Sequence, residues 1–395
     1  MSNLFFANPA VQLSAPFRAD VVGSYLRPAA LQEGRAAFAA GTITQDELTH
    51  IEDQAIADLV AKQKAAGLQV ITDGEFRRSW WHLDFMWGLG GVEKAALDHG
   101  YRFAGIETRA ETARLTGKIS GDNHPFLSHF AFLRLFAEAG VVPRLTVPAP
   151  AQFFKELQRP ENQEATLAIY PDRADLLADI AAAYRQFIAQ LYAAGCRNLQ
   201  LDDCTWGMLI DPDYTNGWAM TPGDNCDCAG APATAQGESL ADLAETLLAL
   251  NNAAVEGAPL DLVITTHVCR GNFRSHWAAK GGYGSIAPYL FARSRYEAFY
   301  LEFDTERAGD FSPLAHVPAG KQVVLGLVSS KVGALEDKQA LIARICEAAR
   351  YVPLENLCLS TQCGFASTEE GNALSEAQQW AKIALVREVA QEVWG

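Results

Sequence analysis

The sequence lacks any long apolar stretch. No segment approaches the roughly 18 continuous apolar residues of a membrane-spanning helix, and the opening MSNLFFANPAVQL has no basic segment followed by an apolar one. We therefore expect neither a membrane span nor a secretory signal peptide. The expected location is the cytoplasm, where thiols stay reduced. The eight cysteines should then be metal ligands, catalytic groups or core residues before they are disulfides.

Basic residues are also scarce relative to acidic ones. The chain has 32 Lys and Arg against 47 Asp and Glu, which gives a formal net charge of −15. Such a charge repels phosphate backbones and anionic lipid, so nucleic acid and membrane surfaces are not expected partners. The acidic residues are scattered, which indicates a solubility surface and not an acidic tail.

Linkers and repeats are absent as well. The sequence has no low-complexity segment between its periodic stretches and no self-similarity at 20–50 residues. Its 395 residues, 49% of them hydrophobic, are enough to bury a core without disulfides or a structural metal. We expect one domain over residues 1–395.

Short apolar runs alternate with longer helical periods, which is the pattern of repeated βα units. Eight such runs predict a single (β/α)₈ barrel, with an inserted hairpin where residues 100–120 alternate between apolar and polar. The expected strands are 19–22, 69–72, 141–146, 198–202, 262–266, 298–302, 322–326 and 357–360. The expected helices are 44–66, 171–194, 239–251, 335–350 and 375–393.

Reactive side chains follow seven of the eight expected strands. In a (β/α)₈ barrel the chemistry lies on the loops that leave the carboxyl ends of the strands, so these residues are expected to meet at one mouth. In strand order they are Ser24, Glu75, Asp202 with Cys204, His267 with Cys269, Glu302, the pair Ser329 and Ser330, and Cys363.

His267 and Cys269 are two residues apart in THVCRGN. At an extended strand end, side chains at i and i+2 point to the same side. Alone, this spacing equally suits a polar residue beside a buried free thiol. Cys363 after the eighth strand and Glu302 at the end of the sixth complete a set of one His, two Cys and one carboxylate, which favours tetrahedral zinc.

Four protein ligands usually indicate a closed structural zinc site. The carboxylate of Glu302, however, is the ligand that an incoming thiol displaces most easily, and that exchange leaves the total ligand charge unchanged. Zinc lowers the pKa of a thiol that binds it. We therefore expect the site, which faces the mouth, to activate a thiol for alkylation.

The other cysteines have weaker signals. Cys226 and Cys228 lie in a segment rich in Gly, Pro and Asn without further Cys or His, so an exposed thiol pair is favoured over a second metal site. Cys196, Cys346 and Cys358 are expected in the core. Contact of Cys204 with a substrate stays open.

Several motifs resemble a known family. They are DVVGSYLRP, ITDGEFRR, LQLDD, THVCRGN, LEFD, VVLGLVSSK and STQCGF. Over residues 18–393 the chain resembles the catalytic C-terminal barrel of cobalamin-independent methionine synthases, particularly the short single-barrel members. The resemblance implies zinc on His267, Cys269, Glu302 and Cys363. It also implies methyl transfer to the thiol of homocysteine, which yields methionine.

The resemblance further implies which residues hold homocysteine. Ser24 would meet its carboxylate, while Glu75 and Asp202 would hold its ammonium group, as charge complementarity requires. The alternative is that both carboxylates form ion pairs at the mouth, with Arg77, Arg78 or Arg270 as partners.

Two departures from the family leave the methyl donor open between methyl-folate and a methyl-corrinoid. Full-length members carry a second, N-terminal barrel that helps to bind folate, and their general-acid histidine corresponds to Val328 here. A tertiary amine leaves poorly unless it is protonated. The Trp80-Trp81-His82 cluster either stacks on a flat donor or packs within its loop.

Two other functions are weighed against methyl transfer. One is alkyl transfer to another thiol, as in epoxide:coenzyme M transferases, but a sulfonate needs cationic side chains where Glu75 and Asp202 lie. The other is a zinc barrel without catalysis, which the complete ligand set and the acid pair disfavour.

Overall fold

The computed structural model describes residues 15–211 and 239–395. Cys226 and Cys228, and with them the question of a second metal site, lie outside these residues. None of the described helices combines the length and the apolar character needed to cross a bilayer.

Six parallel strands form the main sheet. All their residues are buried apart from the first residues of two strands, as expected when both faces of a parallel sheet are covered. Asp202 lies opposite His267 in the register, so the carboxyl ends of neighbouring strands meet at one edge. In spatial order the strands are β7 (Leu145–Pro148), β8 (Asn198–Asp202), β9 (Val263–Val268), β10 (Ala298–Glu302), β11 (Gln322–Val328) and β12 (Leu357–Thr361).

Further parallel pairings continue from both ends of this sheet. β1 (Val70–Ile71) pairs with β6 (Val142–Pro143), which leads into β7. Ala19 bridges to Leu359 of β12, and Ser24 bridges to Gly74 beyond β1. The fold is α/β with a parallel sheet, as expected.

Six expected strands match observed ones within two residues at either end; the first and third differ. Residues 19–22 form only isolated bridges, because the Asp20 carboxylate accepts from the backbone N–H groups of Phe17 and Val21 at 2.9 and 2.7 Å and Gly23 has φ +138°. The expected strand 141–146 is divided at Arg144, where the paired neighbour changes from β1 to β8.

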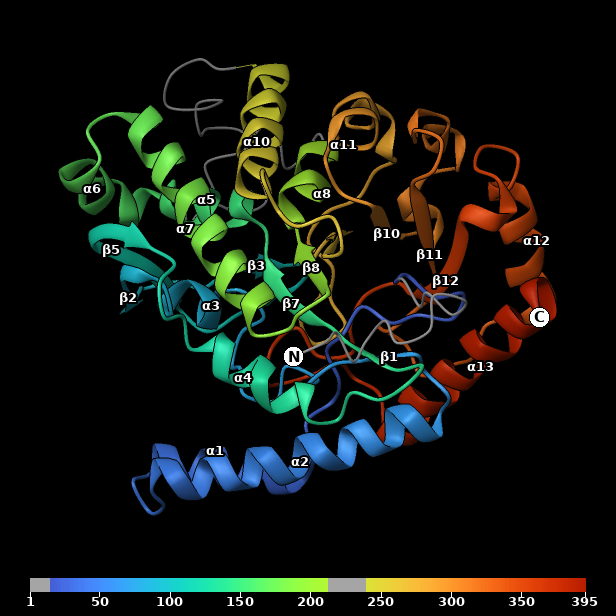
Figure 1. Cartoon of the computed structure of the whole chain (residues 1–395), viewed down its shortest axis with the longest axis horizontal. Helices are drawn as coiled ribbons and strands as arrows, with labels where there is room; N and C mark the ends of the chain where they lie inside the picture. The colour runs from blue at the N-terminus through green and yellow to red at the C-terminus, as the bar shows by residue number, and fades with distance from the viewer. Residues whose placement is uncertain (1–14, 212–238) are drawn as a thin grey trace.

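The five expected helices are present with small shifts of their ends. Three of them begin with a capping box, in which the first side chain and the third residue bond each other's backbone N–H. Figure 1 shows them around the outside of the strands. They are α2 (Gln45–Ala65), α7 (Arg173–Ala193), α10 (Leu240–Ala254), α12 (Lys338–Ala348) and α13 (Glu376–Trp394).

Several shorter elements were not expected. The α-helices are α1 (Ala29–Ala39), α3 (Leu83–Trp87), α4 (Phe126–Arg134), α5 (Pro150–Leu157), α6 (Pro160–Ile169), α8 (Cys204–Ile210) and α11 (Ala287–Arg293). The 3₁₀ turns are η1 (Tyr283–Ser285), η2 (Glu306–Ala308), η3 (Ser312–His316) and η4 (Leu354–Asn356).

Two antiparallel pairs follow β1. β2 (Gly90–Ala96) pairs with β5 (Glu111–Ser120), and β3 (Arg102–Phe103) pairs with β4 (Ile106–Glu107) between them. Residues 100–120, where a hairpin was expected, therefore contain β3, β4 and β5. The strand that pairs with β5 is β2, which lies before residue 100. The β3–β4 turn contacts the loop after β9, since Ala104 N donates to Trp277 O at 3.1 Å.

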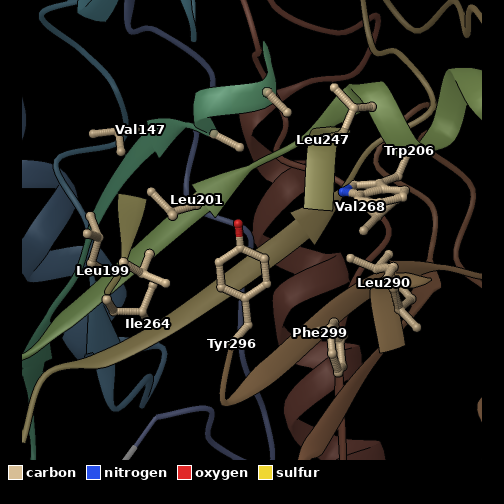
Figure 2. Packing of buried hydrophobic residues seen from close by; sticks show 14 of the residues in the cluster. Val147, Leu199, Leu201, Trp206, Leu247, Ile264, Val268, Leu290, Tyr296 and Phe299 are labelled. Carbon is tan, nitrogen blue, oxygen red and sulfur yellow. The ribbon is translucent and has the colours of Figure 1, made fainter. Parts of the chain in front are cut away.

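The core lies on both faces of the sheet. On the outer face, Leu199, Leu201 and Ile264 of β8 and β9 are buried in the same cluster as Leu247 of α10 and Leu290 of α11 (Figure 2). On the inner side, the buried Arg144 guanidinium donates to Asp20 at 2.8 Å and to the Tyr300 hydroxyl at 2.6 Å, so this buried charge is paired.

The cysteines expected in the core divide into two groups. Cys196 and Cys358 are buried, as predicted. The prediction for Cys346 is wrong, because its thiol is on the exposed face of α12. An amphipathic helix has one buried face and one exposed face. The apolar residues next to Cys346 in the sequence do not show on which of these faces it lies.

Candidate metal centre

Four side chains with metal-ligating atoms meet at the carboxyl ends of the strands. His267 lies near the end of β9 and Cys269 just beyond it, Glu302 ends β10, and Cys363 follows β12. One ligand atom from each lies within 4.8 Å of the others, and all four residues are buried. The two sulfurs are 3.8 Å apart, about the separation of two thiolates that share a zinc ion at roughly 2.3 Å.

The imidazole of His267 is oriented for coordination. Its Nδ1 lies 3.3 Å from the carbonyl oxygen of Tyr300. A carbonyl only accepts, so Nδ1 carries the proton and Nε2 has a free lone pair. Nε2 is buried and has no hydrogen-bond partner among the described residues. A buried imidazole nitrogen left unsatisfied in this way, with its other nitrogen fixed by a carbonyl, fits a metal ligand.

The Glu302 carboxylate is surrounded by donors. Oε1 accepts from the backbone N–H of Arg270 at 2.8 Å, and Oε2 accepts from Arg307 Nη2 at 3.3 Å. Burial alone would raise the pKa of Glu302, but the cations of Lys331, Arg270 and Arg307 outweigh it and hold the pKa below its ordinary value. The carboxylate is therefore ionised before any metal ion binds.

The thiols behave in the opposite way. Contact with the thiol of Cys204, together with burial, raises the pKa of Cys269 well above its ordinary value. Contact with Cys269, followed by burial, does the same for Cys363. The backbone N–H of Gly271 donates to Cys269 Sγ at 3.2 Å, but a divalent cation is what such thiols need to ionise. This donor set fits zinc.

A pocket opens beside the cluster and brings the expected substrate residues to it. Its lining includes Ser24, Glu75 and Asp202 together with His267, Cys269 and Cys363. Glu302 is fully buried and does not line the pocket, so a thiol that enters meets the other three ligands first.

Glu75 is held with one oxygen free. Thr146 Oγ1 donates to its Oε1 at 2.8 Å, and Arg78 Nη1 lies 3.4 Å from the same oxygen. Oε2 is buried and has no partner in the described part of the chain. Burial raises the pKa of Glu75 despite Arg78 and Arg27. The ion pair with Arg78 is therefore present, but it leaves the carboxylate incompletely satisfied.

Asp202 is the second carboxylate of the pocket. Gln200 Nε2 donates to its Oδ1 at 2.8 Å. Burial, and then the neighbouring charge of Glu75, raise the pKa of Asp202 well above its ordinary value. Two buried carboxylates with raised pKa values, one of them raised in part by the other, form a site suited to a cation that arrives with a ligand.

Ser24 lines the same pocket. The backbone N–H of Ala366 donates to its Oγ at 3.3 Å. Gly364 allows this close approach, because a Cβ there would lie 1.9 Å from Ser24 Oγ. The hydroxyl can thus donate its own proton to a ligand.

The aromatic cluster after β1 is mostly packed inward. Trp80 is buried, and its Nε1 donates to Glu111 Oε2 at 2.5 Å. Half-buried Trp81 lies with its ring 4.6 Å from that of His82. His82 Nε2 lies 3.2 Å from the Tyr101 hydroxyl, and burial lowers the pKa of His82 to about 3. Of the three, Trp81 is the ring best exposed to a ligand in the pocket.

Sequence reasoning missed one wall of the pocket. Gln152, Lys155, Glu156 and Arg159 line it from α5 and the residue pair that follows this helix. Pro150 at the first helical position was the available signal. Cys204, left open before, also lines the pocket and lies in one buried cluster with Cys269 and Cys363.

Known proteins resemble this chain over nearly its full length. The profile for the catalytic domain of cobalamin-independent synthase matches residues 17–115. YxjH of Bacillus subtilis (strain 168), described as an uncharacterized protein, is 44% identical over 384 residues, or 97% of this chain and 96% of YxjH. The chain belongs to the cobalamin-independent methionine synthase family.

Solved structures of cobalamin-independent methionine synthases agree with this assignment. The "Putative Vitamin-B12 Independent Methionine Synthase from Listeria monocytogenes" is 38% identical and superposes with a TM-score of 0.72, over 97% of this chain and 100% of that one. A family member from Shewanella sp. W3-18-1, 18% identical with a TM-score of 0.67 over 96% and 98% of the two chains, shares the fold.

Proposed function

We propose that the protein is a zinc-dependent methyltransferase that moves a methyl group to the thiol of homocysteine and so produces methionine. One observation carries the proposal: four zinc-ligating side chains converge within 4.8 Å beside a pocket that also holds two buried carboxylates, Glu75 and Asp202, whose pKa values are raised. A metal site and an amino-acid site thus share one chamber.

His267, Cys269, Glu302 and Cys363 would hold the zinc ion. When bound, the ion lowers the pKa of a coordinated thiol, so that the sulfur is nucleophilic at neutral pH. The chain's own residues prepare the site: the Tyr300 carbonyl fixes the tautomer of His267, and Arg307 keeps Glu302 ionised and positioned. Because Glu302 lies behind the pocket lining, it is the ligand whose release would not obstruct the entering substrate.

Glu75 and Asp202 would bind the ammonium group of homocysteine, and Ser24 its carboxylate. The raised pKa values of the two acids support this role, because a bound ammonium group supplies the positive charge that their surroundings lack. The Shewanella relative, described in complex with selenomethionine, gives independent support for an amino acid of the methionine type.

For the architecture, we infer one (β/α)₈ barrel domain closed through residues 19–24. The parallel bridges of Ala19 to Leu359 and of Ser24 to Gly74 support closure, since they join β12 to β1. The pairs β2–β5 and β3–β4 would then be an insertion after the second strand of the barrel, and β3 adds Arg102 and Phe103 to the pocket.

A donor screen tests the proposed function. Zinc-loaded protein is incubated with homocysteine and, in turn, methyl-folate mono- and polyglutamates, methylcobalamin and simple methyl sulfonium compounds, and methionine is measured by mass spectrometry. We expect methionine with at least one donor and none with the Cys363→Ser variant. If the zinc-loaded protein forms no methionine with any donor, the proposal is wrong.

A further inference from the structure

Lys155 lies in the pocket wall beside the thiols. It is half-buried on α5 and lines the pocket with Cys204 and Met208. Its ammonium group contacts the sulfur of Met208, and Met208 packs against the cluster of Cys204, Cys269 and Cys363. The lysine therefore lines the same pocket as the thiols of the candidate metal site and contacts a residue that packs against them, without being one of the four candidate ligands.

The surroundings of Lys155 favour proton exchange near neutral pH. Burial lowers the pKa of Lys155 to about 8. Of the charged groups that face it, Cys204, Glu156 and Asp203 raise that pKa and Arg159 lowers it further. An acid whose pKa is close to the working pH is both largely protonated and able to release its proton, which is the optimum for general acid catalysis.

Four other titratable groups of the pocket are poorly suited to this task. His82 is neutral, with a pKa lowered by burial to about 3, and burial raises the pKa of Tyr101 well above its ordinary value. Glu75 and Asp202 would be occupied by the substrate ammonium group.

We propose that Lys155 is the proton carrier of methyl transfer from a tertiary-amine donor such as methyl-folate. This inference rests on the proposed function. In the transfer step, the substrate sulfur forms a bond to the methyl carbon, the C–N bond breaks, and the Lys155 ammonium protonates the departing amine. The products are a thioether, a secondary amine and neutral Lys155.

The cycle closes with the next substrate. Neutral Lys155 takes the proton that a new homocysteine thiol loses on ionisation, and this proton passes to the amine that is released when that homocysteine is methylated. No oxidant or reductant is needed, and charge balances in both steps. A methyl sulfonium compound or methylcobalamin releases a leaving group that needs no proton. Lys155 then stays protonated and the thiol proton is released to solvent, so these reactions should not depend on Lys155.

The test compares donors in three variants. Lys155→Met removes the proton, Lys155→Arg keeps the positive charge but does not release a proton at neutral pH, and Lys321→Met is the matched control. Lys321 is a partly buried lysine whose pKa burial lowers, and it precedes β11 at the end of the strand far from the pocket. Initial rates are measured with methyl-folate, methylcobalamin and a methyl sulfonium compound, along with zinc content and homocysteine affinity.

With methyl-folate, both Lys155 variants should be slower by about 10²–10⁴-fold, while zinc content, homocysteine affinity and the rates with the other donors stay within about threefold of wild type. The wild-type rate with methyl-folate should fall as pH rises through about 8, because Lys155 loses its proton there, and the rates with donors that need no proton should lack this fall. Lys321→Met should match wild type.

Each other result is decisive. Equal loss with all donors, or full activity of Lys155→Arg with methyl-folate, overturns the proton-carrier role. A wild type that uses other donors but never methyl-folate overturns it and leaves the proposed function intact, whereas a wild type inactive with every donor removes both. Independently of activity, ¹³C-labelled lysine should show one NMR resonance that titrates near pH 8 and is missing in Lys155→Met; absence of that resonance from wild type also contradicts the proposal.

Discussion

Two carboxylates at the site are almost equally buried, but their pKa values shift in opposite directions: Glu302 belongs to the metal cluster behind the pocket lining, and Asp202 lines the pocket. At the metal end, Glu302 is surrounded by Lys331, Arg270 and Arg307, and these cations hold its pKa below the ordinary value even though burial opposes them. At the substrate end, Asp202 accepts from the neutral amide of Gln200 and faces the carboxylate of Glu75, and its pKa is raised. Both carboxylates are buried, but only Glu302 has neighbouring cations that outweigh the effect of burial on its pKa.

The difference indicates which charged group each part of the site still needs: a divalent cation at the metal cluster, and a positively charged ligand group at Glu75 and Asp202. The metal end already has an ionised carboxylate, an oriented imidazole and two thiols that need a divalent cation to ionise. The substrate end has negative charge without enough cations, so the ligand is expected to bring one. A buried charge that is compensated only when ligand binds lowers stability in the free state, which is a usual feature of functional sites.

Breaking the metal end should have the largest effect. Cys363→Ser removes one of two thiolates, and we expect zinc affinity to fall by more than about 100-fold, with loss of all thiol alkylation and an unchanged circular dichroism spectrum. Zinc content after gel filtration and methionine formation are the measurements. Cys346→Ser, at an exposed thiol on α12, is the control; stoichiometric zinc in Cys363→Ser would count heavily against the ligand set.

Breaking the substrate end should weaken binding without releasing metal. A charge-assisted hydrogen bond is worth about 1.5–3 kcal/mol, so Asp202→Asn should raise the Kd for homocysteine by about 10–100-fold. Calorimetry with zinc-loaded protein measures this. Affinity for 4-mercaptobutyrate, which lacks the amine, should not change, and neither should binding by the exposed-site variant Asp310→Asn. Equal weakening for both thiols would remove Asp202 from the ammonium site.

The substitution Asp202→Asn should also change how the thermal stability of the protein depends on pH. A raised pKa in the folded state means that protonation of Asp202 favours folding, so this stabilisation is present below the ordinary pKa of about 3.9 and is lost as pH rises through the raised value. Asparagine resembles the protonated acid at every pH. In thermal melts without amino acid, Asp202→Asn should match wild type near pH 4 and exceed its Tm increasingly towards pH 8. A constant or reversed difference is incompatible with this assignment.

The smallest expected effect concerns Ser24. Its hydroxyl would contribute one hydrogen bond to the substrate carboxylate, worth about 0.5–1.5 kcal/mol, so Ser24→Ala should weaken homocysteine binding by about 2–10-fold. The matched ligand is 3-aminopropanethiol, which lacks the carboxylate and should bind wild type and variant alike. If the variant loses affinity for both thiols, Ser24 acts through the backbone near Gly364 and not on the carboxylate.

The sequence was most informative where one local rule sufficed. Alternation of apolar runs with helical periods located the strands β8 to β12, and the capping-box residues Thr44 and Glu47 located the start of α2. The i, i+2 spacing at a strand end was enough to place His267 and Cys269 together, and the strand order then predicted that Glu302 and Cys363 would join them.

What the sequence did not reveal depends on long-range contacts. The first strand is reduced to bridges because the Asp20 side chain takes backbone donors and pairs with Arg144 from a distant strand. Lys155 was not recognised, since its position is defined by Met208 and Cys204 on α8, about fifty residues further along the chain. No local pattern distinguishes a lysine on a short helix that faces a pocket from one that faces solvent.

The central claim is that the four ligands hold zinc at a place that a substrate sulfur can reach. X-ray absorption at the zinc edge, recorded on the holoprotein before and after addition of homocysteine, tests it directly. We expect one imidazole, one carboxylate and two sulfur neighbours at first, and a gain of one Zn–S bond when homocysteine binds. A shell that stays the same at saturating homocysteine, or one that never contains two sulfurs, would contradict the account.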